Sequence, residues 1–396
     1  MKKVLFVTYD FPYPLTSGGK TRAFNLMKYA KDKNIELHLL SFTRDDYKEE
    51  WKLALEKIGL SSINVFKRRK VKSINTTLKN ISSKDSIFKT LYYDSKFLGL
   101  MKSIIEKHNI QVVHFESSYT GFYIGDELSK LGVKQILGTE NIEYLLYEDY
   151  LKNSNNYLKK IALHHQVNRF KKEETAMMRK ADLCLAVTQE EADYIKGVSK
   201  DKCEIIENAI SIEDLKFKVH KLDSNNILFV GNFTYMPNVN AISYFIKEVM
   251  PKFEKNITLT IIGKRINEFV TPNSQIIIKE FVKDLTIEYD RADALVFPIK
   301  IGGGTNFKIL EAMALGTPVI GFPDKIMNIG AKPDKEFYSA NTPEEFASQY
   351  LRIRRDGKEV ERITKNARKL IEENYSWEKV GKKLNSIWSK INNDKN

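Results

Sequence analysis

The sequence predicts an α/β protein of two domains, each a parallel β-sheet with helices on both faces. The chain has 396 residues, which is too long for one compact core. Short apolar runs rich in β-branched residues alternate with helical patterns along the whole chain, and most of these runs are continuous. Continuous apolar runs are typical of strands that are buried on both faces of a parallel sheet. The repeated strand–helix order therefore indicates two doubly wound domains.

Five strands are predicted in each half of the chain. They are Val4–Val7, Leu37–Ser41, Val112–Phe115, Gln135–Gly138 and Leu183–Val187, followed by Ile227–Val230, Leu259–Gly263, Ile276–Lys279, Ala294–Phe297 and Pro318–Gly321. The polar segment Glu207–Asn226 separates the halves and is expected to hold the domain boundary. Ligands of such sheets bind at the carboxyl ends of the strands, and two sheets facing each other would form a cleft.

Composition and charge narrow the class of protein. The net charge of +13 comes from 64 Lys and Arg against 51 Asp and Glu. This surplus suits an anionic partner such as a nucleotide, a nucleic acid or an acidic membrane face, and a Lys-rich composition that aids solubility explains it equally well. Two isolated cysteines, Cys184 and Cys203, fit a reducing cytoplasm. The first apolar run ends at Val7, too early for a signal peptide, and no run approaches the roughly 18 residues of a membrane span.

The clearest functional signal is KIGGGTNFKILEAMALGTPVIGF, residues 300–322. A predicted strand runs into three consecutive glycines, and a short helix is predicted from near Phe307, with Gly316 just past its end. Strand, glycine turn and helix is the arrangement that aims free backbone N–H groups at an anion. The sequence therefore predicts a phosphate site at this turn.

Two charged residues on that helix extend the site. Lys308, in the first turn, can reach a phosphate as a point charge, and the carboxylate of Glu311 can accept both hydroxyls of a ribose. The structural alternative is a tight turn followed by a Lys308–Glu311 ion pair at i,i+3, worth roughly a few tenths of a kcal/mol. That alternative needs no run of three glycines, so a nucleotide site is favoured.

The stretch GGGTNFKILEAMALGTPVI also resembles the signature of retaining GT-B-fold nucleotide-sugar glycosyltransferases of family 4. Four more stretches resemble that family's amino-terminal glycine loop, the end of its first domain, the opening of its nucleotide-binding domain and its final helix. They are VTYDFPYPLTSGGKTR, RKADLCLAVTQEEADYIK, ILFVGNFTYMPNVNAISYFIKEVMP and NYSWEKVGKKL. The resemblance implies two Rossmann-like domains facing a cleft, with an acceptor-binding domain over 1–207 and a nucleotide-sugar-binding domain over 208–376. It also implies that the last helix, about 377–396, crosses back over the first domain.

The resemblance implies roles for matched residues. Glu311 would hold the donor ribose, backbone N–H groups of the glycine turn would hold the diphosphate, and the first glycine loop would approach the donor phosphate or the acceptor. The full set expected to bind the donor is Gly18, Gly19, Arg265, Gly303, Gly304, Thr305, Lys308 and Glu311. The plain alternative for Gly18 and Gly19 is a flexible loop.

The chain departs from the family pattern at three positions. Gly303 stands where the family often has a glutamate that contacts the transferred sugar. Asn232 and Asn238 stand where it often has an Arg and a Lys that grip the diphosphate. The missing positive charge is expected to come from Lys308, Lys264 or Arg265.

His114 and Glu116 are candidates for catalysis, together with Lys308. They are two residues apart at a strand end and so point to the same side. The family commonly has a histidine near the reacting sugar, at the position of Glu116. The alternative for His114 is a buried core histidine whose hydrogen bonds are satisfied.

Glu140 and Asn141 follow another predicted strand and are candidates for contacts with donor or acceptor hydroxyls. The alternative for Asn141 is the cap of a helix. Two basic stretches, Phe66–Lys72 and Tyr157–Glu174, form either a solvated face or a surface for anionic lipid. The second possibility follows from the family, in which the first domain often takes a lipid-linked acceptor at a membrane.

The resemblance implies transfer of a sugar from a nucleotide-diphosphate sugar to a glycan or lipid-linked glycan acceptor. The expected process is the synthesis of a cell-surface polysaccharide or glycoconjugate, in the cytoplasm or at the inner face of the membrane. No Asp-x-Asp motif is present, so no metal and no other cofactor is expected.

Alternatives from other classes are weaker. An NAD-dependent oxidoreductase would need G-x-G-x-x-G directly after a strand, and TSGGKTR lacks that spacing. A nucleic-acid partner is not expected because no aromatic-basic signature or zinc spacing is present. A catalytically inactive nucleotide-sugar or glycan-binding module stays open because of Gly303, Asn232 and Asn238. Binding without turnover would identify it.

Overall fold

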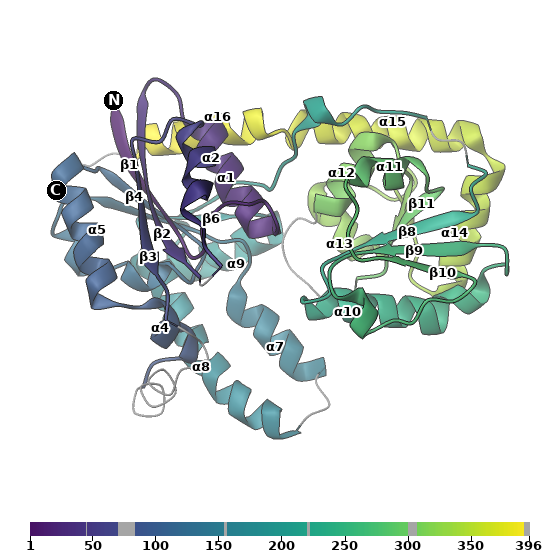
Figure 1. Cartoon of the computed structure of the whole chain (residues 1–396), viewed down its shortest axis with the longest axis horizontal. Helices are drawn as coiled ribbons and strands as arrows, with labels where there is room; N and C mark the ends of the chain where they lie inside the picture. Colours follow the sequence, from purple (N-terminus) through teal and green to yellow (C-terminus); the bar gives the residue numbers. More distant parts are fainter. Residues whose placement is uncertain (45, 70–83, 154–156, 220–221, 300–306, 392–396) are drawn as a thin grey trace. The chain divides into compact units, whose positions relative to one another are not determined.

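The computed structural model of the chain describes residues 1–44, 46–69, 84–153, 157–219, 222–299 and 307–391, and the side chains of these except 153 and 157–162. The chain divides into two compact units (Figure 1). Unit 1 comprises Met1–Glu207 and Trp377–Asn396, and unit 2 comprises Asn208–Ser376. None of the described helices is long and apolar enough to cross a membrane.

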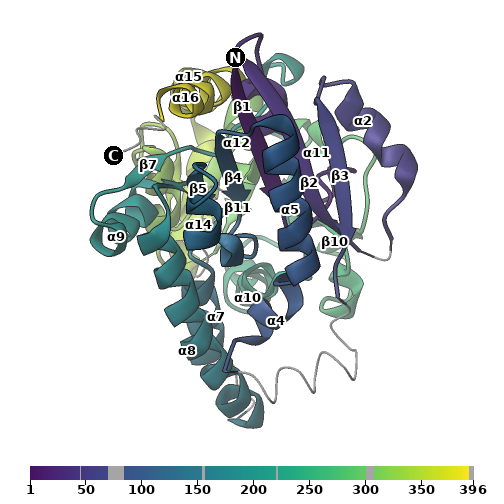
Figure 2. The same ribbon diagram turned by 90° about the vertical axis from the view of Figure 1, so that its left-hand side faces the viewer.

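Unit 1 is built on a sheet of seven parallel strands in the order β3-β2-β1-β4-β5-β6-β7 (Figure 2). The strand order reverses between β1 and β4, so their carboxyl ends form the switch point at which such sheets bind ligands. The strands are β1 (Lys2–Thr8), β2 (Ile35–Thr43), β3 (Ser62–Lys67), β4 (Val112–Glu116), β5 (Lys134–Gly138), β6 (Leu183–Ala186) and β7 (Cys203–Ile205).

Helices cover both faces of the unit 1 sheet. They are α1 (Gly18–Ala30), α2 (Lys52–Glu56), α4 (Ile87–Tyr92), α5 (Ser95–His108), α6 (Asp126–Ser129), α7 (Glu143–Asn153), α8 (Tyr157–Lys180), α9 (Gln189–Ser199) and the last helix, α16 (Trp377–Lys390). Helix α16 buries its apolar stripe in unit 1, as predicted. It lies directly on α1, since a Cβ added at Gly381 would meet the carbonyl carbon of Tyr29 at 2.4 Å.

Unit 2 repeats this architecture with six parallel strands in the order β10-β9-β8-β11-β12-β13. The strands are β8 (Asn226–Val230), β9 (Thr258–Ile262), β10 (Ile276–Lys279), β11 (Ala294–Phe297), β12 (Val319–Gly321) and β13 (Tyr338–Ser339). The helices are α10 (Met236–Tyr244), α11 (Leu285–Asp290), α12 (Phe307–Leu315), α13 (Pro323–Ile326), α14 (Pro343–Arg355) and α15 (Gly357–Asn374). A π turn, Phe245–Val249, prolongs α10.

All ten predicted strands are present, within two residues at each end. The three strands not among them, β3, β7 and β13, lie at or next to a sheet edge and are short or only half-buried. Such strands lack the continuous apolar run that identifies a central parallel strand. The helix over Phe307–Leu315 begins and ends as predicted, and Gly316 follows it with φ of 91°.

Candidate active site

The charged pair of unit 2 lies in the first turns of α12, which follows β11. The Nζ atom of Lys308 donates a hydrogen bond to Oδ1 of Asn238 at 3.0 Å. It also lies 5.2 Å and 5.6 Å from the ring centroids of Phe229 and Phe297, within the range of cation–π attraction. These contacts fix the ammonium group at the carboxyl ends of β8 and β11.

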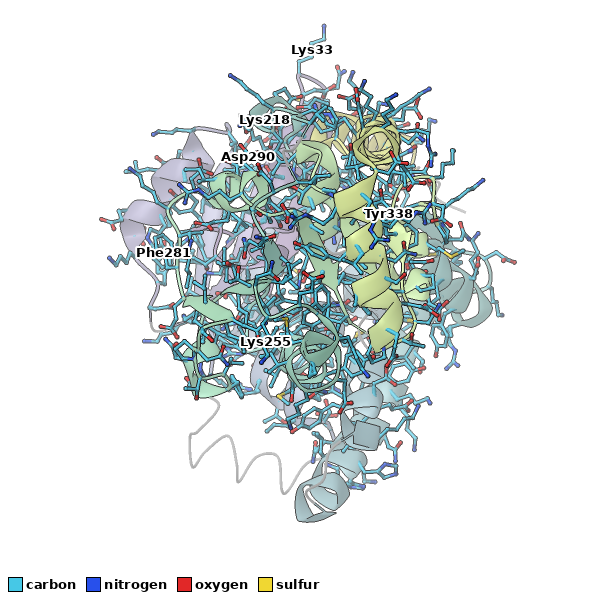
Figure 3. The ribbon with its side chains drawn as sticks, turned by 90° about the vertical axis from the view of Figure 1, so that its right-hand side faces the viewer. Lys33, Lys218, Lys255, Phe281, Asp290 and Tyr338 are labelled. Carbon is cyan, nitrogen blue, oxygen red and sulfur yellow. The ribbon has the colours of Figure 1, made fainter. Side chains whose placement is uncertain are left out.

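Glu311 is held from the neighbouring helix α11. The hydroxyl of Tyr289 donates to Oε2 of Glu311 at 3.1 Å and lies 3.3 Å from the carbonyl oxygen of Lys308. The residue after Tyr289, Asp290, forms an ion pair with Lys218 at the surface, where both side chains are seen together (Figure 3). Helix α11 is thus tied down at the point from which it orients the Glu311 carboxylate.

Burial controls the charge of this pair. It raises the pKa of Glu311 to about 7, although the hydrogen bond from Tyr289 and the charge of Lys308 act in the opposite direction. It lowers the pKa of Lys308 to about 7, and the charge of Glu311 only partly offsets this. A phosphate beside Lys308 would favour the charged form of the lysine.

Asn232 and Asn238 stand where the family often has an Arg and a Lys, and Asn238 contacts Lys308. Its Nδ2 donates to the carbonyl oxygen of Asn232 at 2.8 Å while its Oδ1 accepts from Lys308. Gly231 leaves room for it, because a Cβ there would meet Cγ of Asn238 at 2.9 Å. Asn238 therefore holds the lysine in place and carries no charge itself.

The other donor-side candidates of unit 2 are placed differently. Gly303, Gly304 and Thr305 lie outside the described residues, so their predicted roles stay predictions. Arg265 is exposed, with φ of 67°, and makes a two-pronged ion pair with Glu268 at 2.5 and 2.6 Å. A diphosphate would have to compete with Glu268 for it, so Lys308 is better placed than Arg265 to supply the missing charge.

In unit 1, His114 and Glu116 belong to a buried chain of hydrogen bonds at the carboxyl end of β4. Oε1 of Glu116 accepts from Nε of Arg22 at 2.7 Å, and Oε2 lies 2.8 Å from Nε2 of His114. Nδ1 of His114 lies 3.1 Å from Nε1 of Trp388, on α16. The exposed fraction of Arg22, His114 and Glu116 is 1% or less, and that of Trp388 is 0%.

The hydrogen-bond partners define the form of His114. An indole N–H can only donate, so Nδ1 of His114 must accept from Trp388. The other ring nitrogen then carries the proton and donates it to Glu116. Both ring nitrogens are engaged within the protein, which leaves none for a substrate in this arrangement. The structure thus supports the interpretation of His114 as a buried core histidine, whose hydrogen bond holds the carboxylate of Glu116 in place.

Glu116 is the anionic centre of this chain. Burial by itself would raise the pKa of the carboxyl group, but the charge of Arg22 and the hydrogen bond from His114 outweigh it and lower the pKa to about 2. The carboxylate also lines a small cavity of about 10 Å³, which is near the minimum for one water molecule.

The same cavity brings together the amino end of α1 and the end of β5. Gly19 and Glu140 both line it, and a Cβ at Gly19 would lie 2.6 Å from both carboxylate oxygens of Glu140 and from the hydroxyl of Tyr9. A side chain at position 19 would displace the Glu140 carboxylate or the Tyr9 hydroxyl, and glycine lets both approach α1 closely. Gly18 is the first residue of α1, next to the cap Ser17, so the predicted loop is a helix start rather than a flexible segment.

Glu140 is the least satisfied carboxylate of this group. Its Oε1 is buried and has no hydrogen-bond partner among the described residues. Burial, aided by repulsion from Glu116, raises its pKa to about 7, and the charge of Arg22 opposes the rise. A buried carboxylate without a donor is costly, so this position is suited to a ligand hydroxyl that supplies one.

Asn141 is not what satisfies the start of α7. The backbone N–H groups of Glu143 and Tyr144 donate to the carboxylate of Glu174, from α8, at 3.0 and 2.9 Å. Oε1 of Glu174 also accepts from the hydroxyl of Ser118 at 2.5 Å. The carboxylate of Glu174 therefore caps the amino end of α7, and the side chain of Asn141 does not.

In the described part of the first basic stretch, the arginines make contacts that stabilise the fold. Arg68 donates to the hydroxyl of Tyr92 at 2.7 Å, and Arg69 forms an ion pair with Asp94 at 2.6 Å. Both arginines thereby fasten the segment around α4. In the second stretch, Lys171 pairs with Glu148, while His164 and His165 are exposed.

Four residues of these sites were not identified from sequence: Arg22, Tyr289, Trp388 and Glu174. Trp388 lies on the last helix, and no pattern in the sequence predicted its hydrogen bond to His114. Arg22 stands four residues after Gly18 in SGGKTR. A charged residue on the buried face of a helix was a signal that could have identified it as a site residue. Tyr289 and Glu174 reach their partners across long stretches of chain, and no local pattern reveals such contacts.

Comparison with solved structures identifies the fold class of the chain. The chain resembles sucrose-phosphate synthase from Thermosynechococcus elongatus with a TM-score of 0.73, at 15% identity over 99% of both chains. It resembles Anabaena HepE, solved in complex with UDP and glucose, with a TM-score of 0.68, at 12% identity over 99% of this chain and 100% of that one. Two doubly wound units of this kind define the GT-B fold.

The chain belongs to Glycosyltransferase Family 4, whose model matches residues 16–214. Residues 224–356 match a second model, Glycosyl transferases group 1. A protein in the cps region of Klebsiella pneumoniae is 23% identical over 96% of this chain and 98% of its own length. A glycosyltransferase of Methanocaldococcus jannaschii is 26% identical over 50% of this chain and 57% of its own length.

Proposed function

We propose that this glycosyltransferase moves a sugar from a nucleotide-diphosphate sugar to a glycan or lipid-linked glycan, with retention of configuration. The observation that carries the proposal is the Lys308–Glu311 pair of α12, held at the carboxyl ends of the unit 2 strands by Asn238 and Tyr289. The similar HepE protein has been solved with UDP-glucose, and the Klebsiella relative comes from a cps region. The first observation supports a nucleotide sugar as the donor, and the second supports a role in polysaccharide synthesis.

Unit 2 takes the donor in this proposal. Glu311 accepts the ribose hydroxyls, and Lys308 and the amino end of α12 face the diphosphate. As the sugar–phosphate bond breaks, the diphosphate gains negative charge. A fixed ammonium group and free backbone N–H groups stabilise that charge without having to reorganise. Retention of the anomeric configuration is proposed because the family resemblance implies it. In such a reaction the leaving phosphate guides the attack of the acceptor on the same face of the sugar.

Unit 1 takes the acceptor. Glu140 binds an acceptor hydroxyl through its unpartnered oxygen, beside Gly19 and Tyr9. Glu116 fixes the charge of this pocket, and His114 acts as a positioning residue that holds Glu116. A lipid-linked acceptor would bring the protein to the inner face of the membrane, with the exposed part of α8 as the contact surface.

A panel of nucleotide sugars tests the proposal. We expect one member to raise the melting temperature, because a ligand that binds the folded state stabilises it by RT ln(1 + [L]/Kd). We also expect that member to be consumed when a glycan acceptor is added. Binding without turnover with any acceptor would instead identify the chain as an inactive nucleotide-sugar-binding module. No binding to any member would contradict the proposed donor site.

The reaction is expected to need no divalent metal. Lys308 and the helix end supply the positive charge that a metal would otherwise provide at the leaving group. The initial rate with the selected donor should therefore be the same with EDTA as with added Mg²⁺, measured well below the melting temperature. A rate that vanishes in EDTA and returns with Mg²⁺ would show that the diphosphate is held by metal instead.

A further inference from the structure

A second group of potential ligands lies in unit 1, away from the candidate site. Glu36 and His38 are on β2, towards its amino end, and His108 is the last residue of α5, which lies beside β2 (Figure 2). One ligand atom from each of the three lies within 4.8 Å of the others. The residues that line the proposed acceptor pocket lie at the carboxyl ends of β1, β4 and β5 and in the first half of α1, so this group is separate from the proposed reaction.

The distances suit a transition metal. Nε2 of His38 and Oε1 of Glu36 are 3.1 Å apart. Two ligands on one tetrahedral ion with bonds of about 2.0–2.1 Å lie roughly 3.4 Å apart, so these two atoms need almost no movement. Every pair of ligand atoms lies within 4.8 Å, so His108 has to approach by no more than about 1.4 Å, which its place at a helix end permits. The negative end of the α5 helix dipole also favours a cation there.

The neighbours of the group resemble the outer shell of a metal site. Nδ1 of His38 lies 2.9 Å from the hydroxyl of Ser62, which can accept its proton and so leave Nε2 free to bind metal. Lys3 lies 3.6 Å from Oε2 of Glu36, the oxygen that faces away from His38. Hydrogen-bonded outer partners of this kind hold the ligands in place. The charge of Lys3 lowers the affinity for a cation without blocking Oε1.

We propose that Glu36, His38 and His108 bind one divalent transition-metal ion such as Zn²⁺, with water as the fourth ligand. Without metal, Nε2–H of His38 donates to Glu36 and the Ser62 hydroxyl donates to Nδ1. On binding, the imidazole proton moves from Nε2 to Nδ1 and is donated to Ser62, so neutral His38 releases no proton. The ion joins β2 to α5 and stabilises unit 1, independently of donor or acceptor.

Cobalt is the probe for this site, since Co²⁺ with few ligands absorbs visible light strongly. Titrating the metal-free full-length protein should give an absorption band that saturates at one equivalent and is displaced by Zn²⁺. Replacement His108→Ala should weaken Co²⁺ binding at least about 10-fold, and Glu36→Gln should do the same. The matched control is His164→Ala/His165→Ala, which removes exposed histidines of α8 and should bind like the wild type.

Stability provides the second measurement. Zn²⁺ should raise the melting temperature of the wild type and of the control, but not that of His108→Ala. The melting temperature of metal-free His108→Ala should match that of the wild type, which shows that the variant folds. Equal Co²⁺ affinity in His108→Ala and wild type, or no band at one equivalent, would reduce the group to an ordinary His–Glu–Lys hydrogen-bond network and overturn the proposal.

Discussion

Replacing Glu311 with glutamine is expected to weaken binding of the selected nucleotide sugar by about 100-fold, without unfolding the protein. Two hydrogen bonds from ribose hydroxyls to a charged carboxylate are worth about 1.5–3 kcal/mol each, and an amide retains only part of this. Isothermal titration of the variant against wild type measures the loss. The matched control is Glu361→Gln, which removes an exposed carboxylate of unit 2 and should leave the affinity unchanged.

The same substitution should stabilise the protein at alkaline pH. Burial raises the pKa of Glu311 from 4.5 to about 7 in the folded state. Its contribution to stability is therefore complete below the unfolded value and is lost as pH rises through about 7. Glutamine stays neutral, so Glu311→Gln should exceed wild type by up to about 3 kcal/mol at pH 8, and the gap should close towards pH 4.5.

Urea unfolding at several pH values measures this gap. A variant that binds the nucleotide as tightly as wild type would remove Glu311 from the donor site. A variant with lost affinity and lost stability at every pH would show instead that Glu311 holds the fold together.

Replacing Arg22 with leucine is expected to destabilise unit 1 by about 3–5 kcal/mol. The substitution leaves the carboxylate of Glu116 buried without its cation, and an uncompensated buried charge is among the costliest defects in a protein. Guanidinium unfolding measures the loss. As a control, Arg179→Leu changes an exposed arginine of α8 and should shift stability by no more than about 0.5 kcal/mol.

The effect of Arg22→Leu should depend on pH. The pKa of Glu116 is lowered from 4.5 to about 2, so the stability it contributes in the wild type is present above pH 4.5 and lost as pH falls through about 2. Without Arg22 the carboxyl group takes up a proton more easily, and the deficit should shrink as pH falls. The double variant Arg22→Leu/Glu116→Leu should recover much of the loss, since no buried charge remains. A deficit that neither changes with pH nor recovers would point to lost packing.

The strand and the helix of the predicted donor-side motif could be predicted because they are close together in the chain. The strand Ala294–Phe297, the helix Phe307–Leu315 and its residues Lys308 and Glu311 all lie in one short stretch of the chain. Local propensity and spacing are sufficient to predict such an arrangement. The partners of the pair were not readable in the same way. Asn238 and Tyr289 lie 70 and 22 residues from the groups they contact.

His114 shows more clearly what could not be predicted from the sequence. Its position on a buried strand left two interpretations, catalytic or core, and the difference depends on what its ring nitrogens contact. One of them contacts Trp388, which is 274 residues away. The sequence predicted that the last helix returns to the first domain, but not that its tryptophan would fix the tautomer of this histidine.

The sequence alone determined the two doubly wound units, the course of ten strands and the bounds of α12, because these follow from local apolar periodicity and helix-end signals. Only the tertiary structure decided that His114 supports Glu116, that Arg22 neutralises it, that Glu140 lacks a partner and that Glu36, His38 and His108 meet. Charge, tautomer and ligand geometry are set by atoms that folding brings within about 3–5 Å, and chain order carries no record of that distance.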